Sequence, residues 1–376
     1  MTDYRREFFD FAPCTFLDCA YHGPFPRLAV AGIEQSIELK KNPSRLEARH
    51  FFDITASVRG RLATLVGASP DDIALTNSAT QGIAVVANGL ELQAGDEVVI
   101  ASANFPSNLF TWLHLRRLGV EVRVARPSAG SLRPGDVAPL LAPRTKVLAL
   151  DWVSYTTGAR IDLAAFGELA HRSGAVFVVD ATQGVGAMEM DVKQLPVDVV
   201  VVAAYKWLLG PYATGFAYFR PELRDRLDLG TVNWLTVEGS ADFDALPVDE
   251  FRLPRRAEIF DVPNTANFLN LYALRGSLEF IEKAGVKTVT AHCRRLLDRL
   301  AEGLLARGFR LSAAAQPEHQ STILSFVAAS PVATRKLHER LRAENFAVSL
   351  RHDMICVSPY LYNTEAEIDA LVASCC

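Results

Sequence analysis

The sequence contains no apolar run long enough to cross a membrane and no cysteine pair at metal-binding spacing. A membrane-spanning helix needs about 18 consecutive apolar residues, and the best stretch, Val199–Tyr205, is far shorter. The six cysteines among 376 residues include no Cys-x-x-Cys pair. Their number and spacing argue against a disulfide framework and against a zinc site.

The sequence also lacks a marked excess of charge, since 39 basic residues face 43 acidic ones and the formal net charge is −4. Such a balance is not typical of proteins that bind nucleic acid or anionic membranes electrostatically. The first residues, MTDYRREFFDFAP, interrupt every apolar pair with charge or proline, so no secretory signal is expected. These absences together predict a cytoplasmic protein with no nucleic-acid, membrane or metal partner.

What the sequence does contain is typical of a packed enzyme of about two domains, with 49% hydrophobic and 22% charged residues. Short β-branched runs alternate with helix-period stretches such as Ser107–Leu118 and Leu163–Ser173. Several runs are apolar throughout, as strands covered on both faces should be. We therefore predict an α/β fold with a mostly parallel central sheet and helices on both faces. The expected strands are 73–76, 97–102, 121–126, 146–154, 175–180, 198–205 and 215–219.

The pattern changes after about residue 264. Two long helices are expected at 264–283 and 286–307, followed by strands at 322–327, 346–350 and 355–358. Ser330 is expected to cap a further helix, and Thr364 with Glu367 forms a capping box for the last one. We predict an N-terminal arm (1–20) that joins the last domain, a large α/β domain (21–263) and a smaller α+β domain (264–376).

Polar residues at the strand ends are the first candidates for a site, because ligands of open α/β sheets bind there. Ser78, Ala79 and Thr80 follow the first strand and lead into a helix, where backbone N–H groups can bind a phosphate. Taken alone, the turn favours the simpler interpretation, ordinary helix capping by Ser78 or Thr80, because such caps are common. Phe105, after the second strand, could stack on a flat ring or could simply pack.

The most informative pair is Asp180, which ends one apolar strand, and Lys206, which follows another. A carboxylate at the end of a buried strand needs a cationic or hydrogen-bonding partner. A lysine amine, a carboxylate for a pyridine nitrogen and a nearby anion site are what pyridoxal 5'-phosphate (PLP) requires. The sequence therefore predicts PLP as the cofactor.

The chain resembles the class-V aminotransferase family of fold-type I PLP enzymes, which includes cysteine desulfurases and isopenicillin-N epimerase. The resemblance extends from FLDCAYHGPFP to SPYLYNTEAEID, and its most specific part is DATQ together with YKWLLGP. It implies a fold-type I transferase architecture. It also implies a homodimer in which the partner subunit completes the phosphate site, the matching stretch being 261–265.

The resemblance implies roles for individual residues. Lys206 matches the lysine that binds PLP covalently, and Asp180 the partner of the pyridine nitrogen. The other matching positions are Gln183 near the phenolic oxygen, Phe105 in the ring-stacking place, Ala79 and Thr80 beside Ser78 in the phosphate turn, Tyr205 in place of a phosphate-contacting histidine, and Tyr155 in place of an asparagine.

Two departures bear on the reaction, and a third, Ala203 in place of a phosphate-binding hydroxyl residue, bears on the cofactor site. The loop that carries a nucleophilic cysteine in many desulfurases reads RHDMI here and has none. Cys356 stands where relatives usually have a carboxylate-binding arginine, and a thiol cannot supply a charged two-pronged donor. Arg351 is the candidate replacement, although an exposed turn arginine is an equal alternative. His22 matches a segment near the substrate pocket, where an ordinary turn histidine is just as common.

We therefore expect a PLP-dependent enzyme that acts on an amino acid or amine through an external aldimine and a carbanion. Lys206 would be the base, and Asp180 would keep the ring protonated. Transamination, C–S lyase or desulfurase-like elimination, and epimerisation share this intermediate, and the missing loop cysteine disfavours a persulfide-forming desulfurase. The alternative from another class is a non-catalytic module that keeps the fold.

Overall fold

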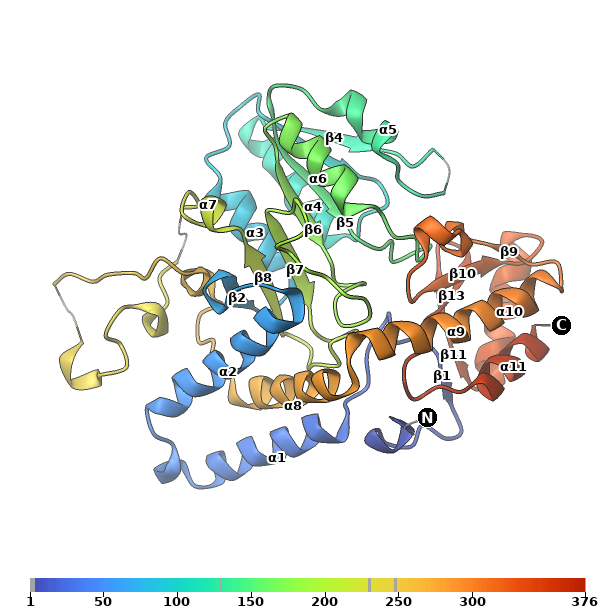
Figure 1. Ribbon diagram of the computed structural model, residues 1–376, viewed down its shortest axis with the longest axis horizontal. Coiled ribbons are helices and arrows are strands. Elements are labelled where there is room, and N and C mark those ends of the chain that lie inside the picture. The colour runs from blue at the N-terminus through green and yellow to red at the C-terminus, as the bar shows by residue number, and fades with distance from the viewer. Residues whose placement is uncertain (1–3, 129, 229–230, 247–248, 376) are drawn as a thin grey trace.

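A seven-stranded sheet forms the centre of the computed structural model, which describes residues 4–128, 130–228, 231–246 and 249–375 (Figure 1). Only β8 runs antiparallel to its neighbours, β2 and β7, and the remaining pairs are parallel. The strand order is β2 (Ile73–Thr76), β8 (Gly215–Phe219), β7 (Val199–Ala203), β6 (Val176–Asp180), β5 (Thr145–Asp151), β3 (Glu97–Ala101) and β4 (Glu121–Ala125).

The continuous apolar strands are buried because helices cover both faces of the sheet. Alternate residues of β7 therefore belong to different cores, with Val199 and Val201 in one and Val200 and Val202 in the other. The first core receives α3 (Ala79–Gly89) and α4 (Ser107–Leu113). The second receives α2 (Arg49–Val66), α6 (Leu163–Arg172) and α8 (Phe268–Ala284). The α/β architecture is the one that the continuous runs predicted.

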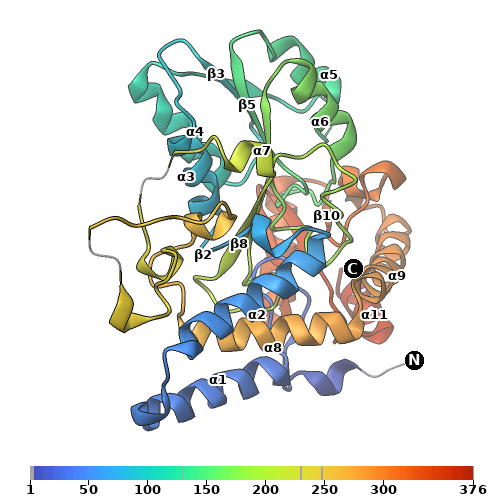
Figure 2. The same ribbon diagram turned by 60° about the vertical axis from the view of Figure 1, so that its left-hand side comes forward.

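Helices α1 (Arg27–Lys41) and α8 lie side by side beneath α2 (Figure 2). Two glycines allow this close approach. A Cβ atom at Gly32 would lie 2.2 Å from the Tyr272 carbonyl oxygen, and one at Gly276 would lie 2.2 Å from that of Leu28. Neither α1 nor α2 was among the predicted elements.

The C-terminal part contains an antiparallel sheet of order β12 (Ser349–Arg351), β13 (Met354–Val357), β10 (Leu324–Val327) and β9 (Arg310–Leu311). Helices α9 (Val286–Leu305), α10 (Pro331–Ala343) and α11 (Glu365–Ser374) cover it with a core of their own. The Ser330 cap and the Thr364–Glu367 capping box are confirmed. Near the N-terminus, β1 (Thr15–Phe16) pairs in parallel with β11 (Phe346–Ala347). Two four-residue helices, α5 (Pro134–Val137) and α7 (Pro221–Arg224), are the remaining α-helices of the described residues.

Several predicted bounds are wrong. The expected strand 346–350 is two strands, β11 and β12, which pair with different partners. The helix expected at 107–118 is α-helical only to Leu113 and continues as a 3₁₀ helix, His114–Leu118. The first long helix begins at Phe268 instead of 264, capped by the side chain of Asn267. Helix α8, which was expected in the smaller domain, packs in the same core as one face of the large sheet. The predicted domain boundary between 263 and 264 therefore stays a prediction. No helix in the described ranges has the length and apolar character to cross a membrane.

Candidate active site

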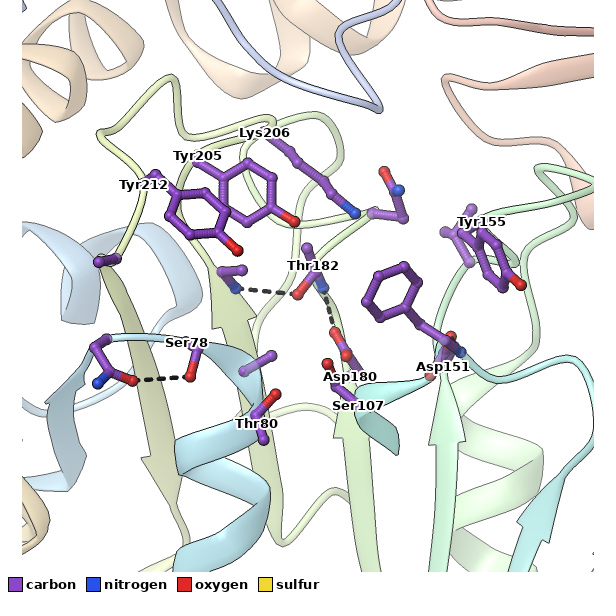
Figure 3. Close-up of a pocket in the computed structure, with 17 residues that line it drawn as sticks. Ser78, Thr80, Ser107, Asp151, Tyr155, Asp180, Thr182, Tyr205, Lys206 and Tyr212 are labelled. Atoms are coloured by element: carbon purple, nitrogen blue, oxygen red, sulfur yellow. Dashed lines mark hydrogen bonds between the residues drawn. The ribbon is translucent and has the colours of Figure 1, made fainter. Parts of the chain in front are cut away.

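A cavity of about 360 Å³ lies at the carboxyl ends of β5, β6 and β7, beside the N-terminus of α3 (Figure 3). The structure brings all nine predicted cofactor-binding residues to its wall, although they come from six separate stretches of the chain. They are Ser78, Ala79, Thr80, Phe105, Tyr155, Asp180, Gln183, Tyr205 and Lys206. Their clustering follows from the sheet, whose parallel strands end at one edge.

Lys206 directs its amine into this cavity from the turn after β7 (Figure 3). Its side chain is only 5% exposed, and Nζ lies 4.9 Å from the ring centroid of Phe105. Burial lowers the pKa of Lys206 from 10.5 to about 8, and the charge of Asp180 opposes this shift. About a tenth of the amine is therefore uncharged at pH 7, and the uncharged form is the one that acts as a nucleophile or base.

Asp180 is the last residue of β6 and is also buried. Burial raises the pKa of its carboxyl group, whereas hydrogen bonding to Thr182 and the charge of Lys206 lower it. The Thr182 backbone N–H donates to Oδ1 at 3.0 Å, and the Thr182 hydroxyl accepts from the Ala203 N–H at 3.0 Å. Thr182 thus fixes the carboxylate relative to both strand ends, and the carboxylate faces the cavity.

The N-terminus of α3 supports both interpretations of the Ser78 turn. Ser78 Oγ accepts from the Gln81 N–H at 3.2 Å, which makes it an ordinary N-cap, and donates to Asn77 Oδ1 at 2.8 Å. Ser78, Ala79 and Thr80 nevertheless line the cavity. Their turn presents backbone N–H groups and the positive end of an 11-residue helix, which favour an anion.

Four aromatic residues, Phe105, Tyr155, Tyr205 and Tyr212, also line the cavity. The rings of Phe105 and Tyr155 meet edge to face with centroids 5.2 Å apart. The Tyr155 hydroxyl lies 3.3 Å from His352 Nε2, in the hairpin between β12 and β13. Tyr205 stacks obliquely between Tyr212, at 4.9 Å, and His22, at 5.3 Å. The aromatic side chains of the cavity are therefore held in place by contacts with one another, with His22 near the N-terminus and with His352 in the C-terminal sheet.

Gln183 lines the cavity, but its amide is held from outside it. Nε2 donates to the Ala20 carbonyl at 2.9 Å, and Oε1 accepts from Trp207 Nε1 at 3.0 Å. These bonds connect the N-terminal segment to the turn that carries Lys206. The second Nε2 hydrogen can still donate to a ligand.

The two predicted substrate residues, His22 and Arg351, are not among the residues that line the cavity. Arg351 Nη1 donates to the Tyr155 carbonyl at 2.6 Å, and Nη2 lies 3.7 Å from Asp18 Oδ1. Its side chain is 12% exposed, so it is not the surface arginine of the alternative interpretation. The positive charge of Arg351 lowers the pKa of Lys206, so it acts on the cavity although the side chain does not line it.

Across the β12–β13 pair Cys356 lies opposite Ser349, whereas Arg351, two residues further along β12, lies opposite Met354. The Cys356 thiol is fully buried, lies 2.9 Å from Ser325 Oγ and donates to the Thr156 carbonyl at 3.1 Å. Burial raises the pKa of Cys356 to about 11, opposed by the charge of Arg351. Such a thiol is a packing group and a hydrogen-bond donor, not a nucleophile.

Segment 261–265, the match to a partner's phosphate contact, is anchored to its own chain by Asp261. The carboxylate accepts from Arg59 Nη1 at 3.0 Å and Nη2 at 2.7 Å and from the Leu75 N–H at 2.7 Å. The segment therefore lies along β2, the edge strand of the sheet.

Sequence reasoning missed several lining residues. Of these, Asp151 has the clearest feature in the sequence, because it is a carboxylate after an apolar run, as Asp180 is. In the structure the two residues end neighbouring strands and pair in register. The lining residues outside the predicted nine are Asn77, Ser107, Asp151, Val153, Thr182, Ala203, Tyr212 and Ala213.

The donor set suits PLP. A buried amine of lowered pKa, a carboxylate on the neighbouring strand end, a helix N-terminus and an aromatic ring surround one cavity. These are the groups needed to hold an aldehyde, a pyridine nitrogen, a phosphate and a flat ring.

Comparisons with known proteins agree with this chemistry. The family model for aminotransferase class-V matches residues 33–371. The chain is 30% identical to the cysteine desulfurase CsdA of Escherichia coli, over 95% of this chain and 92% of that protein. It is 27% identical to the isopenicillin N epimerase of Streptomyces clavuligerus, over 93% and 91%.

Solved structures show the same fold. The structure of a C-DES mutant with glycine covalently linked to its PLP cofactor superposes with a TM-score of 0.90 at 21% identity. That match covers 100% of this chain and 99% of the other.

Proposed function

Because this chain belongs to the class-V aminotransferase family, whose cofactor is PLP, we propose that it removes a proton from the carbon beside the amine of an amino acid or amine. The observation that carries the proposal is the buried Lys206 amine beside Asp180 in one cavity. Transamination or C–S bond elimination is the reaction we favour, and epimerisation is the alternative. All three begin with this proton transfer.

The residues divide the work by their chemistry. Lys206 would hold the cofactor covalently and carry the proton at Nζ, while Asp180 would pair with the ring nitrogen. The N-terminus of α3, with Ser78 and Thr80, would hold the phosphate, and Phe105 would stack on the ring. When bound, PLP supplies an electron-withdrawing ring that stabilises negative charge at the substrate carbon.

The direct test is exchange of the substrate's α-proton with solvent. The purified enzyme is incubated with a panel of amino acids and amines in D₂O, and loss of the α-proton signal is followed by NMR. Product analysis of the exchanging compounds then identifies the reaction. Exchange with none of the panel, by protein that carries PLP, would contradict the proposal.

The lowered pKa of Lys206 predicts how the apoprotein takes up PLP. Only the uncharged amine attacks an aldehyde, and a pKa of about 8 leaves roughly a tenth of Lys206 uncharged at pH 7. The rate of covalent attachment, followed by visible absorbance, should therefore rise with pH and level off above about pH 9. A rate that still climbs beyond pH 10 would show a lysine of ordinary pKa.

Arg351 is our proposed anchor for a substrate carboxylate, since it is a largely buried cation whose charge acts on Lys206. Arg351→Ala should lower kcat/KM for an amino acid about 30-fold by removing a charge-assisted hydrogen bond. The same change should cost little with the corresponding amine, which has no carboxylate. Cys356→Ser is the matched control, because serine can keep the bonds to Ser325 and Thr156.

Two outcomes would contradict this assignment. Equal losses with the amino acid and the amine would mean that Arg351 only supports Tyr155, whose carbonyl it contacts. Loss of activity in Cys356→Ser, with cofactor still bound, would make the thiol catalytic after all.

A cytoplasmic homodimer is part of the proposal. Ala203, in place of a hydroxyl residue, offers no side-chain donor to a phosphate, and Ser78 Oγ is already bonded to Asn77 and Gln81, so a partner would supply further donors. Segment 231–246 extends away from the body (Figure 1). It exposes Trp234, Phe243 and Leu246, which a second copy could cover.

Sedimentation of the PLP-bound protein should give a dimer, and a monomer that keeps its cofactor would contradict this.

A further inference from the structure

Asp151 is an acidic residue of the cavity that the proposed chemistry leaves without a role. It ends β5, pairs in register with Asp180 and lines the same cavity. Two carboxylates this close repel one another, and burial raises the pKa of Asp151 well above its usual range, with the charge of Asp180 adding to the shift. Such a costly arrangement calls for hydrogen-bond donors.

Both oxygens of Asp151 find these donors in one segment, 104–108. Oδ2 accepts from the Phe105 backbone N–H at 2.6 Å, and Oδ1 accepts from Asn108 Nδ2 at 3.0 Å. Asn104 strengthens the attachment, because its Oδ1 accepts from the Asp151 N–H at 3.2 Å and its Nδ2 donates to the Ala149 carbonyl at 2.9 Å. Asn108 Oδ1 in turn accepts from Trp112 Nε1 at 2.9 Å.

The residue fixed by this network is the aromatic ring of the cavity. The Phe105 backbone N–H donates the shortest of these bonds. The centroid of the Phe105 ring lies 4.9 Å from Lys206 Nζ and 5.2 Å from that of the Tyr155 ring. Displacing residue 105 would therefore move the ring relative to the amine.

We propose that Asp151 is a positioning residue, which holds Phe105 where its ring can stack on the cofactor. The proposal rests on the proposed function, in which PLP occupies this cavity. A purely structural role, in which Asp151 only attaches the start of α4 to β5, is the alternative that the experiment must separate.

The test is a double-mutant cycle on the apoprotein, with the dissociation constant of PLP as the readout. Asp151→Ala should weaken PLP binding about tenfold, near the upper value of one aromatic stacking contact. Phe105→Leu should do the same. In the Phe105→Leu background, Asp151→Ala should add no more than about twofold, because its effect passes through the ring.

Two matched variants separate positioning from stability. Asp151→Asn keeps an oxygen for the Phe105 N–H and should bind PLP within about threefold of the wild type. Asn108→Ala loosens the start of α4 and leaves Phe105 bonded to Asp151, so it should lower the thermal stability but not the affinity.

A pH profile tests separately whether Asp151 carries its charge beside Lys206. The carboxylates of Asp180, Asp151 and Asp18 raise the pKa of Lys206, and Arg351 lowers it. Removing the Asp151 charge should therefore shift the labelling of Lys206 by an amine-reactive reagent to lower pH in Asp151→Asn apoprotein. Mass spectrometry reports the labelled fraction.

The failures are distinguishable. Wild-type apoprotein that does not bind PLP would overturn the proposed function, and this inference with it. If the wild type binds PLP but Asp151→Ala keeps full affinity, or loses a further tenfold in the Phe105→Leu background, only the positioning role of Asp151 is overturned.

Discussion

Lys206→Ala should lose covalently held PLP and at least about 1,000-fold of the turnover. Removal of the amine takes away the covalent attachment and the base that carries the substrate proton, and acid–base catalysis alone is worth about 100- to 10,000-fold. The visible absorbance of the purified variant measures the first loss. Exchange of the α-proton with D₂O measures the second.

Lys146→Ala is the matched control, because Lys146 lies at the opposite end of β5 from the cavity. Its side chain is 48% exposed, and its Nζ lies 3.9 Å from Asp96 Oδ1. It should retain full absorbance and activity. A Lys206→Ala protein that still exchanges the α-proton at a rate near that of the wild type would show that another group is the base.

Asp180→Ala should keep PLP attached but lower turnover about 100-fold or more. The carboxylate would stabilise positive charge on the ring nitrogen, and such preorganised electrostatic contacts are worth a few kcal/mol in a transition state. The measurement is the rate of α-proton exchange for the best substrate of the panel. Asp53→Ala, on the exposed surface of α2, is the control.

The alanine variant also removes the acceptor for the Thr182 N–H, so its fold must be checked by thermal unfolding. An Asp180→Ala enzyme that unfolds normally, holds PLP and exchanges the α-proton at the wild-type rate would exclude Asp180 as the partner of the ring nitrogen.

The sequence predicted the central sheet well because its strands are apolar on both faces. Runs such as VVVV in β7 have no amphipathic alternative, and their observed bounds lie within a few residues of those expected. The direction and the partners of the strands were harder to predict from the sequence. The antiparallel direction of β8 and the division of 346–350 between β11 and β12 depend on contacts with distant segments, which local patterns do not encode.

The candidate site was predictable where a residue type, its place at a strand end and the family motif agreed, as for Lys206 and Asp180. Asp151 matches no motif, and the strand predicted there ran on to residue 154, so the sequence did not place Asp151 at a strand end as the structure does. The surroundings of Arg351 could not be inferred either, because Asp18 and Tyr155 reach it from distant parts of the chain.

The central claim is that Lys206 is the residue that binds the cofactor, and peptide mapping tests it most directly. The PLP-bound wild-type protein is reduced with borohydride, digested and analysed by mass spectrometry. We predict that the reduced cofactor is found on the peptide that contains Tyr205, Lys206 and Trp207, with the added mass on Lys206. Finding the added mass on another lysine, or on none in protein that is visibly loaded, would contradict the account.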